Sequence, residues 1–338
     1  MRLDELDYEL PADLIAQQPL AERDASRLLV VERGGALTHR VFRDLADLLA
    51  PGDLLVVNDS RVLPARLLGH KAGSGGQVEL LLLRPTAPGQ WECLARPGRR
   101  LRSGTVVEFE ELRATLLARL GEGLWTVAFD PPEALRPTLD RLGAMPLPPY
   151  IHARLDDPER YQTVYAREDG SAAAPTAGLH FTPALLSRLA ERGVGRASVT
   201  LHVGLDTFRP VQCARVEDHP MHREHWQVPL EAADAIAATK AAGRRVVAVG
   251  TTVVRTLESA ALADGAVSAG EGWTDLLITP GHRFRAVDAL LTNFHLPRTT
   301  LFALVCAFAG SEPIRAAYAE AIAARYRLLS FGDAMLLW

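Results

Sequence analysis

Two histidines stand in surroundings that favour proton transfer. His180 lies in the stretch SAAAPTAGLHFT, residues 171–182, which contains no Asp, Glu, Lys or Arg. His202 lies near the end of a predicted strand, shortly before Gly204. An imidazole has an unperturbed pKa of ~6.5, so both rings can accept or donate a proton near pH 7. We expect the small residues before His180 to form the floor of a ligand pocket, with packed core histidines as the alternative.

Polar residues follow a buried strand in VVNDSRVLPARL, residues 56–67. In open α/β sheets ligands bind beyond the carboxyl ends of the strands. Arg61 is expected to hold a carboxylate or phosphate there, with Asp59 orienting its guanidinium. In the alternative, Asp59 caps a turn and Arg61 pairs with it at the surface. Arg209, in the turn after His202, is a further candidate for substrate binding.

A second strand leads into a helix through VAVGTTVVRTLES, residues 247–259. Thr251 and Thr252 would present hydroxyls and free backbone amides to an anion at the helix N-terminus, and Arg255 is a further binding candidate. Simple capping by threonine is the alternative. The segment lacks the repeated glycines of a dinucleotide loop and the lysine of a P-loop.

A third strand ends in LLTNFHLPRTTL, residues 290–301. The amide of Asn293 can read a base edge or fix a ribose, and the imidazole of His295 can transfer a proton. The alternative is a turn asparagine beside a packed histidine.

The run HPMHREHWQV, residues 219–228, spaces His219, His222 and His225 evenly. On a strand or loop this spacing points the rings in different directions, and no cysteine lies nearby, so no metal site is expected. Glu224 is a candidate acid, base or ligand for a substrate amine. A solvated surface glutamate is the alternative.

Length and composition limit the class of protein. The 338 residues exceed the ~250–300 at which single cores stop growing, which predicts two domains. The net charge of −4 argues against non-specific nucleic-acid binding, although RPGRRLR, residues 96–102, and HRFR, residues 282–285, are local basic patches. No apolar run spans a bilayer, the N-terminus is polar, and the three cysteines lie far apart. We expect a cytoplasmic monomer that does not bind a membrane.

The elements that must position these residues follow two patterns. Short apolar runs punctuated by Gly and Pro over residues 66–130 predict a small antiparallel barrel, followed by a proline-rich exit, AMPLPPYIHA. Elsewhere strands alternate with helices, which predicts the α/β class with a largely parallel sheet. We therefore predict an α/β domain of residues 1–65 and 151–338, split by an inserted antiparallel β-barrel of residues 66–150.

Individual elements are expected at defined places. The segment 28–42 predicts a hairpin that turns at Gly34-Gly35. Further strands are predicted at 196–203, 245–250, 274–281 and 288–294, and helices at 182–193, 230–243, 252–265, 299–310 and 313–326.

Several blocks, taken in order, resemble one family closely. They include YELPADLIAQQPLAERDASRLLV, DLLVVNDSRVLPARL, GSAAAPTAGLHFT, LHVGLDTFRPV, MHREHWQV, VGTTVVRTLES, LLTNFHLPRTTLFALVCAFAG and LSFGDAMLL. The family is that of the S-adenosylmethionine:tRNA ribosyltransferase-isomerases of queuosine biosynthesis. The resemblance is weakest over residues 66–130. The chain departs from the family at Asp206, where glycine is usual, and at Arg223 and His225.

The resemblance implies that the ribosyl part of S-adenosylmethionine is transferred to the aminomethyl group of a 7-deazaguanine at the tRNA wobble position and isomerised. Epoxyqueuosine would form, and adenine and methionine would be released. S-adenosylmethionine would be a co-substrate and the deazaguanine-bearing tRNA the partner, with no metal or prosthetic group. The candidate catalytic residues are His180, His202 and Glu224, and the candidate substrate-binding residues are Asp59, Arg61, Thr176, Gly178, Arg209, Thr251, Thr252, Arg255, Asn293 and His295.

Two other functions remain as alternatives. An S-adenosylmethionine-dependent RNA methyltransferase usually has an acidic GxGxG loop after a strand, which this chain lacks. A non-catalytic RNA-binding protein needs a basic and aromatic surface rather than several histidine-bearing strand ends.

Overall fold

The computed structural model describes residues 1–121, 123–204, 211 and 213–338. The chain divides into two compact units. The first, here called the α/β unit, comprises Met1–Arg61, Pro148–Glu168 and Ala174–Trp338. The second, the barrel unit, comprises Val62–Leu147 and Asp169–Ala173.

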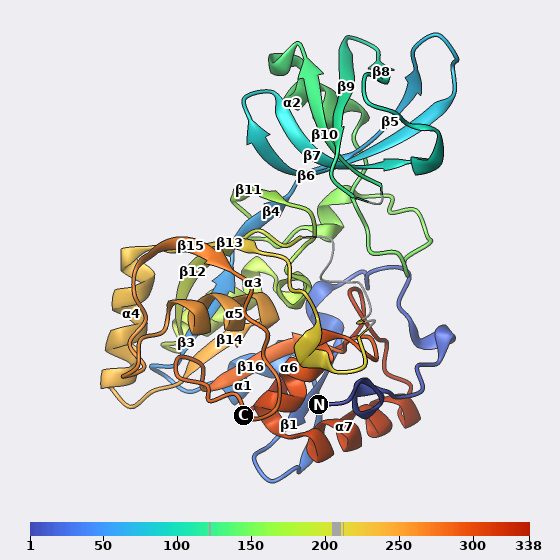
Figure 1. Ribbon diagram of the computed structural model, residues 1–338. Coiled ribbons are helices and arrows are strands. Elements are labelled where there is room, and N and C mark those ends of the chain that lie inside the picture. The colour runs from blue at the N-terminus through green and yellow to red at the C-terminus, as the bar shows by residue number, and fades with distance from the viewer. Residues whose placement is uncertain (122, 205–210, 212) are drawn as a thin grey trace. The chain divides into compact units, whose positions relative to one another are not determined.

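A mixed sheet is the centre of the α/β unit (Figure 1). Within the described residues it has nine strands, in the order β15 (Gly270–Thr274), β13 (Glu224–Val228), β12 (Gly195–Leu201), β3 (Leu54–Asn58), β14 (Val246–Val249), β16 (Ala289–Asn293), β17 (Ala334–Leu337), β1 (Arg27–Val31) and β2 (Leu37–Val41). The central strands β12, β3, β14 and β16 run parallel. The antiparallel pairs lie toward the edges, so the predicted parallel arrangement describes the middle of the sheet.

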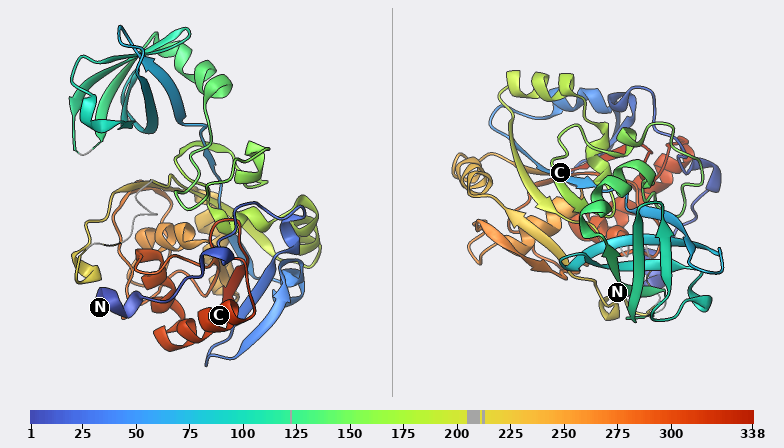
Figure 2. Two further views of the ribbon diagram at one scale, coloured as in Figure 1. Left: turned by 90° about the vertical axis from the view of Figure 1, so that its right-hand side faces the viewer. Right: turned by 90° about the horizontal axis from the view of Figure 1, so that it is seen from above.

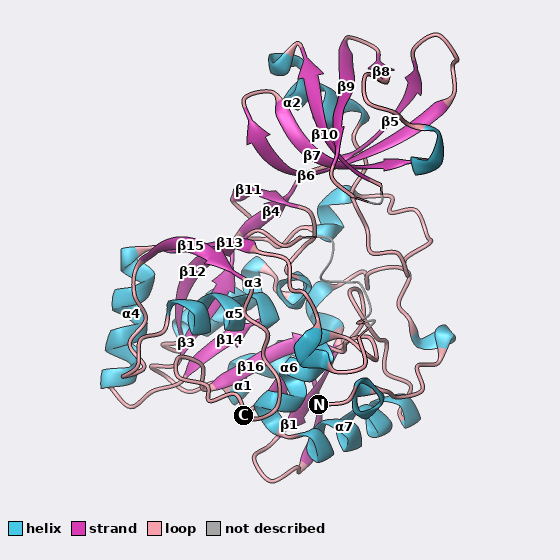
Figure 3. Ribbon diagram, viewed as in Figure 1, coloured by secondary structure: helices cyan, strands magenta, loops and turns pink. Residues whose placement is uncertain are grey.

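Helices cover both faces of this sheet (Figure 3). Successive residues of a strand point to opposite faces, and accordingly Leu29 and Val31 pack in one core while Leu28 and Val30 pack in the other. The first core includes α4 (Leu230–Ala241), α5 (Thr251–Ala260), α6 (Thr300–Ala309) and α7 (Ser311–Ala323), and the second includes α1 (Leu45–Leu48) and α3 (Pro183–Glu191). The predicted α/β class is confirmed.

Threonine and glycine set the helix boundaries. Thr182 caps α3 by accepting a hydrogen bond from Leu185 N at 3.1 Å, and Thr299 caps α6 in the same way. Gly310, with φ +91°, separates α6 from α7 at a bend of 113°. In the described part of the chain no single helix is long and apolar enough to cross a membrane; α6 and α7 reach that length and composition only jointly, across their bend.

The barrel unit is a closed antiparallel barrel (Figure 2). Its strands follow the order β10 (Leu124–Asp130), β7 (Gln90–Arg96), β6 (Gln77–Ala87), β5 (Arg66–Lys71), β8 (Val106–Phe109) and β9 (Leu112–Arg119), with β9 pairing back to β10. Alternate residues of β10, namely Trp125, Val127 and Phe129, are buried in its interior. The helix α2 (Leu135–Leu142) follows the last strand. The predicted antiparallel barrel is confirmed.

Some predicted elements are wrong. A strand was expected at 274–281, but the structure has β15 at Gly270–Thr274 instead. Thr274 is the last residue of β15 that pairs with β13, and the chain leaves the sheet after it. The helix expected at 252–265 ends at Ala260, since Ala261 has extended backbone and forms a bridge with Val267. The strands that were not predicted include β13, β17, and the short β4 (Ser60–Val62) and β11 (Glu168–Ser171), which pair with each other.

Candidate active site

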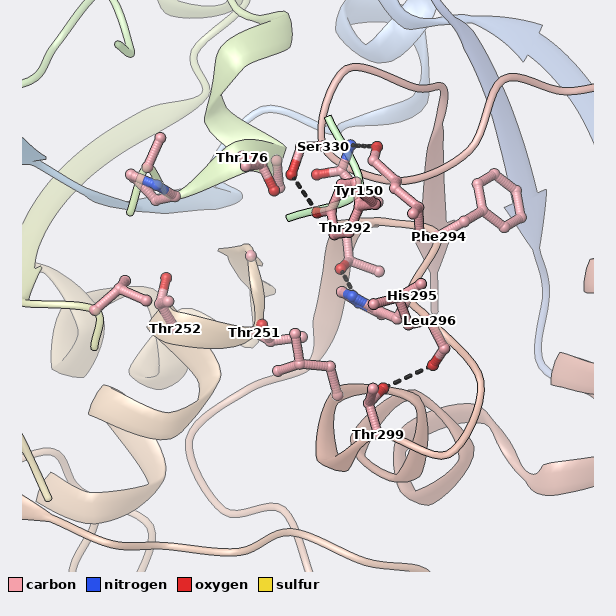
Figure 4. A pocket seen from close by; sticks show the side chains of 18 residues that line it. Tyr150, Thr176, Thr251, Thr252, Thr292, Phe294, His295, Leu296, Thr299 and Ser330 are labelled. Atoms are coloured by element: carbon pink, nitrogen blue, oxygen red, sulfur yellow. Dashed lines mark hydrogen bonds between the residues drawn. The ribbon is translucent and has the colours of Figure 1, made fainter. Parts of the chain in front are cut away.

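The main pocket of the α/β unit opens where β14 and β16 end (Figure 4). Gly250 follows β14 and Asn293 is the last residue of β16, so both pocket walls begin at carboxyl ends of parallel strands. The cavity measures about 630 Å³ including its open mouth. Its lining is formed by Tyr150, residues 174–177, Val203, residues 250–252, residues 292–296, Thr299, Leu301 and residues 329–330. Five residues predicted from separate segments therefore meet here: Thr176, Thr251, Thr252, Asn293 and His295.

The N-terminus of α5 forms one wall. Gly250 precedes it with φ +94°, a conformation that favours glycine, and no side chain caps the helix. The hydroxyl of Thr252 is buried and has no hydrogen-bond partner among the described residues. The first turn of α5 thus offers backbone amides and a hydroxyl to a ligand in the pocket.

Asn293 forms the opposite wall and is held from behind by His180. The side chain amide of Asn293 donates to His180 Nε2 and to the carbonyl of Leu329, both at 3.3 Å. Its oxygen Oδ1 is buried and has no partner within the described part of the chain. With Asn293 donating to Nε2, the Nδ1–H of His180 donates to Ser26 Oγ, 2.8 Å away.

His180 is therefore a buried, neutral imidazole. It ends the 3-10 helix η8 (Thr176–His180), is 5% exposed, and stacks on Phe42 with ring centroids 4.8 Å apart. Burial lowers its pKa to about 4. Because both ring nitrogens contact protein atoms, His180 meets the pocket through Asn293 rather than directly.

His295 lines the pocket itself. Its Nε2 lies 2.9 Å from Thr292 Oγ1, and its backbone N–H donates to the hydroxyl of Tyr318 at 2.8 Å. Tyr8 donates to its carbonyl oxygen at 2.6 Å, so backbone and ring are both fixed. Burial lowers the pKa of His295 to about 3, which leaves the ring neutral near pH 7.

Sequence reasoning missed four polar lining residues, namely Tyr150, Thr292, Thr299 and Ser330. The hydroxyls of Tyr150 and Ser330 lie 2.7 Å apart at the pocket wall (Figure 4). Tyr150 belongs to the stretch predicted as a proline-rich exit. Ser330 interrupts the apolar run near the C-terminus, and a lone polar residue in such a run is the one local signal that points to it.

A second pocket contains a buried ion pair. Glu224 and Arg255, each 5% exposed, are paired through Oε2 and Nη1, which excludes the solvated surface position considered for Glu224. Glu224 Oε1 accepts from the backbone of Gly204 at 2.9 Å, and Arg255 Nε donates to the carbonyl of Leu276 at 3.1 Å. The cavity measures about 510 Å³ including its mouth, and Leu301 lines both pockets.

Asp59 and Arg61 are separated from the main pocket. The carboxylate of Asp59 accepts from Thr200 Oγ1 at 2.7 Å and from Arg167 Nη2 at 2.9 Å, and burial raises its pKa. Arg61 pairs instead with Glu159 at 2.5 Å. The expectation that Asp59 orients Arg61 is wrong, because each side chain has a partner from a segment more than ninety residues further along the chain.

The remaining predicted residues have other positions. His202 is half-buried and precedes Val203, which lines the main pocket. Its ring stacks on that of His225, with the ring centroids 6.3 Å apart. Gly178 is packed so closely that an added Cβ would lie 2.1 Å from Tyr165 Oη. Arg209 and Asp206 lie outside the described residues. Across the described ranges, no three His, Cys, Asp or Glu side chains gather as metal ligands.

The chain is similar over its whole length to proteins of one known family. The family model described as queuosine biosynthesis protein matches residues 3–337. The chain is 59% identical over 343 residues to the S-adenosylmethionine:tRNA ribosyltransferase-isomerase of Anaeromyxobacter sp. (strain Fw109-5), covering 100% of this chain and 99% of that one. It is 57% identical over 344 residues to the protein of the same name from Moorella thermoacetica, covering 100% of both chains.

A solved structure is similar as well. The crystal structure of S-adenosylmethionine tRNA ribosyltransferase from Thermotoga maritima is 41% identical, with a TM-score of 0.57, and the match covers 99% of this chain and 100% of that one. The family resemblance of the sequence blocks is thereby confirmed. The chain belongs to the family of queuosine biosynthesis proteins whose relatives are named S-adenosylmethionine:tRNA ribosyltransferase-isomerases.

Proposed function

We propose that this chain transfers the ribosyl part of S-adenosylmethionine to the aminomethyl group of a 7-deazaguanine in the wobble position of tRNA and isomerises it. Epoxyqueuosine is formed, and adenine and methionine leave. The observation that carries the proposal is the full-length identity of 59% to a relative named for this activity. We further propose that the enzyme works in the cytoplasm, where its tRNA substrate is found, and that it is a monomer requiring no metal or prosthetic group.

The reaction makes three demands on the site. A base removes a proton from the carbon beside the sulfonium, an acid assists the departure of adenine, and an uncharged amine attacks. A positioned acid or base contributes roughly 10²–10⁴-fold to the rate of such a step. The two leaving molecules must also be held in place while the ring is rebuilt.

The main pocket suits the nucleoside of S-adenosylmethionine. The first-turn amides of α5 and the hydroxyl of Thr252 can bond to acceptors and hydroxyls of the ligand. The side-chain oxygen Oδ1 of Asn293 can accept a hydrogen bond from a ribose hydroxyl or an adenine amino group. Small side chains such as Ala174 and Ala177 let the backbone approach a bulky nucleoside closely.

The histidines divide into two roles. His295 lines the pocket and is neutral near pH 7, which makes it a candidate base for the proton beside the sulfonium. His180 is neutral too, but it acts as a positioning residue that aims the oxygen of Asn293 at the ligand. Neither neutral ring serves readily as the acid for adenine, and Glu224 is paired as an anion with Arg255, so His202 is the remaining candidate proton donor.

One assay separates the candidate functions. Purified protein is incubated with S-adenosylmethionine and deazaguanine-bearing tRNA, and the small products are separated. Release of adenine and methionine in equal amounts with the modified nucleoside is the expected result. S-adenosylhomocysteine would identify a methyltransferase, and the absence of any product at saturating protein would identify a binding protein; either result contradicts the proposal.

A further inference from the structure

We propose that the second pocket binds the amino-acid end of S-adenosylmethionine, with Arg255 contacting its α-carboxylate and Glu224 its α-ammonium group. The main pocket then holds the nucleoside end of the same molecule. The inference rests on the proposed function, since it assigns parts of the co-substrate to two neighbouring cavities.

Arg255 is prepared to bind a carboxylate. Its Nη1 pairs with Glu224 and its Nε donates to the carbonyl of Leu276, while Nη2 is buried and has no partner among the described residues. A buried donor without a partner is costly in a protein. A carboxylate that enters the pocket satisfies this donor, and guanidinium binds carboxylates through parallel hydrogen bonds.

Glu224 supplies the opposite charge. An α-amino acid carries one carboxylate and one ammonium group on the same carbon, and the Glu224–Arg255 pair presents one anion and one cation side by side. The carboxylate of Glu224, which pairs with Arg255 and accepts from the backbone of Gly204, lines the pocket and supplies the negative charge that an ammonium group requires. Bringing the zwitterion against the ion pair keeps every buried charge compensated.

The walls of the second pocket fit the rest of a methionyl group. Met221, Leu277 and Leu304 supply apolar surface for its methylene carbons. Leu301 lines both cavities, so the two ligand ends lie on either side of one side chain. Along α5, Thr251 in the main pocket and Arg255 in the second are four residues apart, roughly 6 Å of helix rise.

The main pocket is a poor place for the amino-acid end. The described residues that line it include no Asp, Glu, Lys or Arg. The N-terminus of α5 offers a partial positive charge of about +0.5 to a carboxylate. It offers nothing acidic to the ammonium group, which the second pocket does through Glu224.

The test is a comparison of ligands that differ in one group. Binding of S-adenosylmethionine and of its decarboxylated analogue is measured by calorimetry on the wild-type protein, on Glu224→Gln/Arg255→Met, and on Thr252→Val. The double substitution removes both charges together, because breaking one half of a buried pair strongly destabilises a fold. Should it fail to fold, Arg255→Lys keeps the charge, loses the guanidinium fork, and serves for the same comparison.

We expect the wild type to bind the decarboxylated analogue about 10–100-fold more weakly than S-adenosylmethionine. The charge-free variant should bind the two ligands almost equally, and Arg255→Lys should show a reduced preference. Thr252→Val should weaken both ligands alike and keep the preference. Equal binding of the two ligands by the wild type, or loss of the preference in Thr252→Val instead, would overturn the assignment. If the preference is present but no adenine is released with tRNA, the proposed reaction fails and the binding assignment stands.

Discussion

Asn293 and His180 are joined by a buried hydrogen bond of 3.3 Å that fixes which atom of the asparagine faces the main pocket. The side-chain amide of Asn293 donates to His180 and to the carbonyl of Leu329, so its Oδ1 can accept a hydrogen bond from a ligand. His180 is held in turn by Ser26 and by the ring of Phe42. The histidine thus determines the hydrogen-bonding character of the pocket without lining it.

A double-mutant cycle tests whether His180 acts through Asn293. We expect Asn293→Ala and His180→Ala each to lower kcat/KM by about 10–100-fold, since each removes or misdirects the same ligand contact. The double variant should be little worse than Asn293→Ala alone, because residues that act as a unit are not additive. Steady-state adenine release measures all four proteins. Multiplying effects would show that His180 acts independently of Asn293 and would contradict this positioning role.

The buried ring of His180 also makes stability depend on pH. Its pKa falls from an ordinary 6.5 to about 4 on folding. Between pH 6.5 and 4 this histidine is therefore protonated in the unfolded chain and neutral in the folded protein. The free energy of unfolding is therefore highest above pH 6.5 and decreases as the pH is lowered toward 4. From pH 7 to pH 4.5 this group accounts for a loss of about 2–3 kcal/mol.

His180→Gln removes that titration and provides the control. Urea unfolding of the wild type and the variant is compared at pH 7 and pH 4.5. The wild type should lose about 2–3 kcal/mol more than the variant over this interval. His295 titrates in the same direction in both proteins, so its contribution cancels. Equal losses in the two proteins would contradict a neutral buried His180.

Local sequence patterns predict the helices and strands of this protein better than they predict which distant residues contact one another. The 28–42 hairpin, the barrel strands and the helix after β14 follow from periodicity and glycine turns, and the helix after β16 follows from periodicity and its threonine cap. Asn293 and Thr251 were predicted for the pocket because the carboxyl ends of parallel strands meet at one edge.

Contacts between distant segments could not be predicted in this way. Arg61 pairs with Glu159 and Asp59 with Arg167, and nothing in their local sequence selects these partners. The last strand, β17, enters the sheet between β16 and β1, although its run AMLL is too short to distinguish a strand from a buried turn. The Arg255–Glu224 pair depends on such a distant contact as well.

Gly178 is required by close packing, which can be tested by adding one methyl group. In Gly178→Ala the new Cβ would meet Tyr165 Oη at 2.1 Å and Thr163 Cγ2 at 2.8 Å. Overpacking of this kind costs about 1–3 kcal/mol. It should also displace Thr176 in the same 3-10 helix and raise the KM for S-adenosylmethionine.

A matched glycine supplies the control for this variant. A Cβ at Gly76 would meet only Ser74 Oγ, at 3.7 Å, and this glycine does not have positive φ. Gly76→Ala should therefore leave both the thermal midpoint and the KM close to wild type. A Gly178→Ala protein as stable and active as Gly76→Ala would show that the segment before His180 tolerates movement.

Two threonines at helix starts should respond in opposite ways to the same substitution. Thr252 Oγ1 is buried without a partner in the described structure, so Thr252→Val removes no internal hydrogen bond and should leave the free energy of unfolding unchanged or raise it. If that hydroxyl binds the ligand, the KM for S-adenosylmethionine should rise about 5–10-fold.

Thr299→Val instead removes the cap of α6, where Oγ1 accepts from Phe302 N at 3.3 Å, and should cost about 0.5–2 kcal/mol of stability. Thermal unfolding and adenine-release kinetics on both variants separate these outcomes, and a stability loss in Thr252→Val with no change in KM would mean that its hydroxyl serves the fold rather than the ligand.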